Sequence, residues 1–92
     1  MIVSFRDRLT ARFAAGEAVR KFSAFARQAE VRLDRLEAAT SLADLAALPG
    51  NRLEALKGDR AGQYSIRIND RWRICFRWTS SGPEQVEIVD YH

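Results

Sequence analysis

Residues 63–78 read QYSIRINDRWRICFRW, and this stretch is the clearest indication of the fold. Apolar and polar side chains alternate over residues 63–69 and again over residues 71–78, which is the two-residue repeat of a strand buried on one face. The Asn69-Asp70 pair between the two runs is typical of a short turn. The stretch therefore predicts a pair of antiparallel strands.

Weaker signals place further strands on both sides of this pair. Ser80-Ser81-Gly82-Pro83 predicts a second turn, which leads into a last strand over residues 84–89. Upstream, a short strand is expected over residues 52–56, joined to the pair by the loop 57–62. Ile2-Val3-Ser4-Phe5 predicts another short strand near the beginning of the chain.

The first half of the chain has a helical period instead. After a helical start that breaks at Gly16, a longer helix is expected from Glu17 to about Ala39. Its apolar positions recur at spacings of three and four: Val19, Phe22, Ala26, Ala29, Leu33 and Leu36. Ser41 and Asp44 then predict the cap of a short helix through Leu48. We therefore expect one α+β domain over residues 1–92, with an N-terminal strand and two to three helices packed on one face of a small antiparallel sheet.

Alternation along residues 71–78 also predicts two chemically different faces. Trp72, Ile74, Phe76 and Trp78 share one face, which we expect to pack against the helices as core. Arg71, Arg73 and Arg77 then emerge on the opposite face. Cys75 is expected on that polar face too, as an exposed thiol without a role. The open face of the sheet should be cationic.

The formal net charge of +3 is distributed unevenly. Residues 52–77 hold seven Lys or Arg against three acids, a net +4, whereas residues 78–92 hold three acids and no base. Most of the cations in the middle segment are arginines, whose planar fork suits phosphate. The pattern favours a polyanionic partner, and a solvated basic face is the alternative.

The sequence ends on Asp90-Tyr91-His92, which contains its one histidine. Histidine and tyrosine can both transfer a proton, and an adjacent carboxylate can orient them. If the meander closes tightly, Lys57 and Arg73 would hold a phosphate beside this acid-base group, as in a small nuclease. The alternative is a frayed terminus whose histidine is only solvated.

Composition excludes several other classes of site. One cysteine rules out an internal disulfide, and with one histidine it cannot form a zinc site of four ligands, so we expect no metal and no cofactor. The longest nearly apolar stretch, residues 42–48, is far shorter than the roughly 20 residues that span a bilayer. Residues 1–7 do not resemble a secretion signal. A cytoplasmic protein without a membrane partner is expected.

Several blocks occur in order along nearly the whole chain. They are Ile2-Val3-Ser4-Phe5-Arg6, Leu36-Glu37-Ala38-Ala39-Thr40, Leu56-Lys57-Gly58-Asp59-Arg60, residues 63–69, Trp72-Arg73-Ile74-Cys75-Phe76 and Asp90-Tyr91-His92. Together they resemble the HigB toxins of bacterial toxin-antitoxin systems, within the wider RelE/ParE superfamily. The resemblance implies a ribosome-dependent endoribonuclease that cuts mRNA on the 70S ribosome. It also implies a HigA-type helix-turn-helix antitoxin, through which alone the toxin would reach operator DNA.

The resemblance further implies which residues form the site. The catalytic set would be Lys57, Arg73, Asp90, Tyr91 and His92. The arginines expected to contact RNA or the ribosome are Arg60, Arg67, Arg71 and Arg77. Glu54 stands where related proteins often have a histidine, so it either acts as a carboxylate base or is a surface residue paired with Arg52 or Lys57.

These residue types suit metal-independent cleavage of RNA. The 2′-hydroxyl would attack the adjacent phosphorus, which requires a proton acceptor, a proton donor and cations for the developing charge. We expect His92 to transfer protons, Tyr91 to assist, and Asp90 to hold the imidazole or act as base. Two alternatives remain: a ParE-like inhibitor of gyrase, which would not need the acid-base tail, and a basic module that binds RNA or the ribosome without cleaving.

Overall fold

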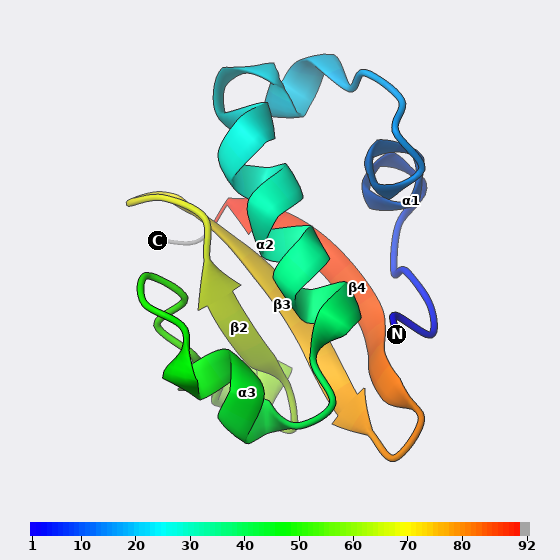
Figure 1. Ribbon diagram of the computed structural model, residues 1–92. Coiled ribbons are helices and arrows are strands. Elements are labelled where there is room, and N and C mark those ends of the chain that lie inside the picture. Colours follow the sequence, from blue (N-terminus) through cyan, green and yellow to red (C-terminus); the bar gives the residue numbers. More distant parts are fainter. Residues whose placement is uncertain (91–92) are drawn as a thin grey trace.

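The structure, a computed structural model, describes residues 1–90 and confirms an α+β fold of helices on one face of a sheet (Figure 1). The sheet has four antiparallel strands in the order β1-β2-β3-β4. They are β1 (Glu54–Ala55), β2 (Tyr64–Arg67), β3 (Trp72–Thr79) and β4 (Gly82–Asp90). The helices are α1 (Arg8–Ala14), α2 (Ala26–Ala38) and α3 (Leu42–Ala47), with short 3-10 helices η1 (Arg20–Phe25) and η2 (Gly58–Arg60). None of the helices within residues 1–90 combines the length and hydropathy needed to cross a bilayer.

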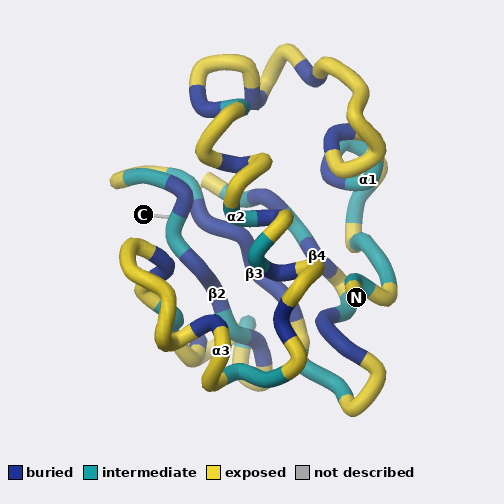
Figure 2. Tube along the Cα trace, viewed as in Figure 1, coloured by how far each residue is buried: buried dark blue, intermediate teal, exposed yellow. Residues whose placement is uncertain are grey.

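The core lies between α2 and the sheet, as the alternation predicts. Ile74 and Phe76 of β3 are fully buried there, together with Phe22 and Leu36 from the helical layer. Trp72 packs on the ring of Phe25 with 4.8 Å between ring centroids. Figure 2 shows the buried positions gathered along the strands and on the inner side of α2. Phe76 of β3 therefore belongs to the core, and Trp72 and Trp78 are partly buried against it.

The long helix predicted from Glu17 is divided into two pieces. Residues Arg20–Phe25 form the 3-10 helix η1, and α2 begins only at Ala26. A 3-10 turn places residues three apart above one another, so Phe22 and Phe25 both point into the core. Burial of this pair explains why the tighter helix replaces the first α-helical turns.

Residues 2–5 run beside β4 but form a single parallel bridge, Phe5 to Val86, rather than the predicted strand. A bulge in β4 limits the pairing, because its register against β3 shifts between Cys75 and Arg77. At this bulge Gln85 has φ 56°, and its amide donates to Ser4 Oγ at 3.0 Å. The edge of the sheet is thus bent where the first strand would pair.

The predicted strand over residues 52–56 contracts to Glu54–Ala55. Arg52 has φ 45°, a left-handed conformation that a strand cannot contain. The chain therefore turns at Arg52 and enters the sheet two residues later.

The face of the sheet opposite the helices is not as open as predicted. The segment that contains η2 is tied to it, since Arg60 Nη1 donates to Gln63 Oε1 at 3.1 Å and to Glu87 Oε1 at 3.2 Å. Cys75 is fully buried on this face, and Arg73 is only 9% exposed. The expectation of an exposed Cys75 thiol is wrong, because the strand period predicts the face of a residue but not what covers that face.

Candidate functional site

A basic depression lies on the face of the sheet opposite the helices, and its volume is about 590 Å³. Four arginines and two carboxylates are among the residues that line it: Arg52, Glu54, Arg67, Asn69, Asp70, Arg71 and Arg73. The lining therefore carries a formal +2 (four minus two). Such a surface suits an anion with several oxygens, such as the phosphate backbone of a nucleic acid.

Arg73 is the buried member of this set. Its Nε donates to Ser65 Oγ at 2.7 Å, and its Nη2 donates to the carbonyl oxygen of Arg52 at 2.6 Å. These bonds fix the plane of the Arg73 guanidinium. Arg73 thus joins β3 to β2 and to the turn at residue 52, and its predicted contact with phosphate remains a prediction.

Strand register places Glu54 near Arg73. Glu54 pairs with Ser65, whose hydroxyl accepts from Arg73, and directly opposite residues in antiparallel strands share a face. Glu54 is exposed and makes no hydrogen bond or ion pair with any residue in 1–90. The surface pairing with Arg52 or Lys57 is therefore not formed, and the carboxylate lies in the depression.

Asp90 lies at the end of β4 and is bound by Arg71. Arg71 Nε lies 2.9 Å from both carboxylate oxygens, and Arg71 Nη2 lies 2.6 Å from Oδ2. Hydrogen bonding to Asp90, followed by its negative charge, raises the pKa of Arg71. The predicted acid-base carboxylate is therefore connected to the depression through Arg71. Tyr91 and His92 lie outside the described residues, so their predicted roles stay predictions.

Three of the predicted cations are not among the residues that line the depression. Lys57 is exposed at the start of η2, and Arg60 is engaged by Gln63 and Glu87. Arg77 is exposed, and its guanidinium lies beside Gly62. The structure thus gathers Arg67, Arg71, Arg73 and Glu54 at one place.

Sequence reasoning misses three residues of the lining, namely Arg52, Asn69 and Asp70. The pattern predicts the pair Asn69-Asp70 only as a turn, although the carboxylate of Asp70 binds Arg67. The sequence pattern gives Arg52 only a share in the basic charge of its segment and a possible pairing with Glu54. The signal available for all three is their nearness to predicted strand ends, where loops place functional side chains.

Cys75 lies beside this face but has no feature of a reactive thiol. Burial is the main cause that raises its pKa, and the positive charge of Arg60 opposes this only in part. The thiol therefore stays protonated near neutral pH and serves as core.

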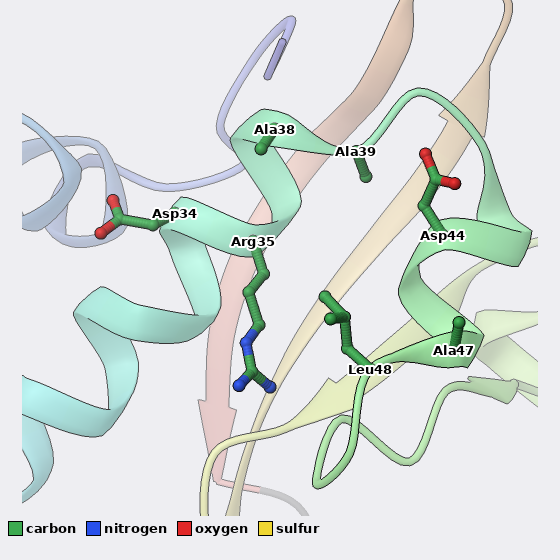
Figure 3. A pocket seen from close by; sticks show the side chains of 7 residues that line it. All are labelled: Asp34, Arg35, Ala38, Ala39, Asp44, Ala47 and Leu48. Carbon is green, nitrogen blue, oxygen red and sulfur yellow. The ribbon is translucent and has the colours of Figure 1, made fainter.

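A second hollow lies between α2 and α3, with a volume of about 510 Å³. Figure 3 shows Leu48 reaching from the end of α3 toward α2, with small alanines on either side. Arg35 borders it, but its Nη1 donates to Pro49 O and to Asn51 Oδ1, both at 3.0 Å. This hollow is mainly apolar and contains none of the predicted site residues.

Known proteins similar to this chain point to one family. Residues 3–92 match the family described as "RelE-like toxin of type II toxin-antitoxin system HigB". A protein from Vibrio cholerae named "Toxin HigB-1" is 45% identical over 47 residues, which cover 51% of this chain and 50% of that protein. A protein from Proteus vulgaris named "Endoribonuclease HigB" is 34% identical over 61 residues, which cover 64% of this chain and 66% of that protein.

The fold also has a solved counterpart. A structure titled "YoeB/ParE toxin from Agrobacterium tumefaciens" matches with a TM-score of 0.58 at 22% identity, over 99% of this chain and 96% of the other. At this identity the match supports the fold. Together with the family match, it confirms the resemblance and the fold class predicted from the sequence.

Proposed function

This chain belongs to the HigB family of RelE-like toxins from type II toxin-antitoxin systems, and on this basis we propose that it is an endoribonuclease that cuts mRNA on the ribosome. The observation that supports the proposal is the depression with four arginines, which is bordered by an ion pair to Asp90. Its charge and shape suit a phosphodiester backbone. The name of the relative from Proteus vulgaris, "Endoribonuclease HigB", points in the same direction.

Cleavage would follow attack of the ribose 2′-hydroxyl on the adjacent phosphorus. Arg73 and Lys57 would stabilise the additional negative charge, while His92 transfers protons with the help of Tyr91. Asp90 would hold the imidazole or accept the proton, and Glu54, a carboxylate that lines the depression, is the second candidate for a base. This reaction requires no metal ion.

The pair between Arg71 and Asp90 adds a step to this mechanism. A phosphate that binds Arg71 competes with Asp90 for the same guanidinium, because one fork cannot serve two bidentate partners at full strength. Arrival of RNA would therefore free the Asp90 carboxylate for its role in the reaction.

The partners follow from the same family membership. A HigA-type antitoxin with a helix-turn-helix domain would neutralise the toxin and connect it to operator DNA. The ribosome would present the mRNA, so the site of action would be the cytoplasm.

The test is a map of mRNA 5′ ends after controlled expression, with and without active translation. We expect cuts in phase with codons that disappear in His92→Ala and Lys57→Ala and remain in Lys21→Ala. Lys21 is a matched control because it is an exposed lysine of η1 without a partner among residues 1–90. Growth inhibition without cleavage but with DNA damage would point to gyrase as the target. If neither cleavage nor DNA damage is found, the alternative of a module that binds RNA or the ribosome without cleaving is favoured.

A further inference from the structure

We propose that Arg52 is an RNA-binding residue whose guanidinium holds a phosphate of the single-stranded substrate backbone. The inference rests on the proposed function and adds a binding residue to its site. Arg52 lines the basic depression and has an exposed side chain. Three separate observations support this role, namely the backbone of Arg52, the residues that hold it, and the charges around it.

The backbone of Arg52 is strained. Its φ of 45° lies in the left-handed region, and Gln85 is the one other non-glycine residue among 1–90 with a positive φ. The bulge of β4 accounts for Gln85, whereas Arg52 lies in the turn that leads into β1. Glycine would adopt this conformation without the steric cost that a side chain imposes. Strain of this kind is often found where a side chain must be aimed at a ligand.

The neighbours of Arg52 hold this conformation rigidly. Asn51 is fully buried, donates to Leu45 O at 3.0 Å and accepts from Arg35 at 3.0 Å. On the other side, the carbonyl oxygen of Arg52 accepts from Arg73 at 2.6 Å. The strained turn is thus fixed from both layers of the fold, and a binding group on a fixed backbone loses less entropy when it engages a ligand.

Charge pairing leaves Arg52 available to an external anion. The other arginines of the depression have partners, since Arg67 pairs with Asp70, Arg71 pairs with Asp90, and Arg73 donates to Ser65. The side chain of Arg52 makes no hydrogen bond or ion pair with any residue in 1–90. Its fork can therefore take two oxygens of a phosphate without first breaking an internal contact.

The test is binding of a fluorescein-labelled, 2′-O-methylated single-stranded RNA, which cannot be cleaved, by fluorescence anisotropy over a series of salt concentrations. Arg52→Ala should weaken binding about tenfold, as expected for loss of one charge-assisted contact. It should also reduce the slope of log affinity against log salt by about 0.7, the value for one phosphate contact on a single strand. Arg52→Lys should keep the slope but lose part of the affinity, because it keeps the charge and loses the fork.

Two further variants make the result specific. Arg27→Ala removes an exposed arginine of α2, outside the depression, and should change neither affinity nor slope. Arg52→Gly relieves the left-handed backbone, so it should melt no lower than wild type and still bind RNA as weakly as Arg52→Ala. This variant decides the question if Arg52→Ala is poorly folded.

The outcomes separate this inference from the proposed function. If wild type cleaves mRNA while Arg52→Ala and Arg52→Gly bind RNA like Arg27→Ala, the role of Arg52 is refuted and the nuclease stands. If wild type neither binds nor cleaves RNA, both are refuted.

Discussion

Replacement of Arg73 by alanine tests whether one buried guanidinium holds the floor of the depression together. Arg73 is 9% exposed and makes two short hydrogen bonds, 2.7 Å to Ser65 Oγ and 2.6 Å to the carbonyl oxygen of Arg52. Hydrogen bonds to charged groups contribute about 1.5–3 kcal/mol each, and a buried acceptor that loses its donor is costly. We therefore expect Arg73→Ala to lower the free energy of unfolding by about 3 kcal/mol.

The assay is thermal unfolding followed by circular dichroism, with urea unfolding as a second measurement. For a domain of 92 residues, a loss of about 3 kcal/mol corresponds to a Tm lower by about 12–24 °C. Arg77→Ala is the matched control, because Arg77 lies on the same strand but is exposed and makes no hydrogen bond or ion pair with residues 1–90. That variant should stay within about 0.5 kcal/mol of wild type.

A double-mutant cycle with Ser65→Ala attributes the loss to the bond itself. Ser65→Ala should cost less in the Arg73→Ala background than in wild type, because its hydroxyl has then already lost its donor. If Arg73→Ala melts within about 2 °C of Arg77→Ala, the guanidinium of Arg73 does not hold the floor of the depression together. If the predicted loss is found, nuclease assays of Arg73→Ala must be made well below its Tm, since lost activity would otherwise report unfolding.

Two further predictions concern other parts of the chain. Cys75 should react with iodoacetamide only as fast as the protein opens, because burial covers the thiol and raises its pKa. Arg60→Ala should speed the reaction, since it removes the contact between Arg60 and Glu87 that helps to cover the thiol. Labelling is measured by mass spectrometry, and rapid labelling of native wild type would contradict the prediction. Hydrogen bonds from Thr40 lower the pKa of Asp44, so this carboxylate stabilises the fold above its unfolded pKa of about 3.9, and the contribution is lost as the pH falls through the lower folded pKa. The difference in Tm between wild type and Asp44→Asn should therefore be largest near neutral pH and shrink in acid, and a difference that is constant with pH would refute the assignment.

The order of residues along the chain is enough to predict the class of fold and the side of the sheet on which each residue of β3 lies. Both follow from local chemistry. A two-residue period places Ile74 and Phe76 on one face, and the turn preference of Asn69-Asp70 does not depend on where the two strands lie in the fold. The cap of α3 is predictable for the same reason, since Ser41 accepts from the amide of Asp44 three residues away.

What covers the opposite face, and which charges meet there, depends on the assembled tertiary structure. The contacts responsible join distant positions, namely Arg60 with Glu87, Arg73 with Arg52, and Arg71 with Asp90, which are 27, 21 and 19 residues apart. The pattern of hydrophobic and charged residues along the chain does not predict which distant residues form such pairs. The left-handed turn at Arg52 is likewise held by Asn51 and Arg73 rather than by a local preference of arginine, so its place in the site emerges only once α2, α3 and the sheet are assembled.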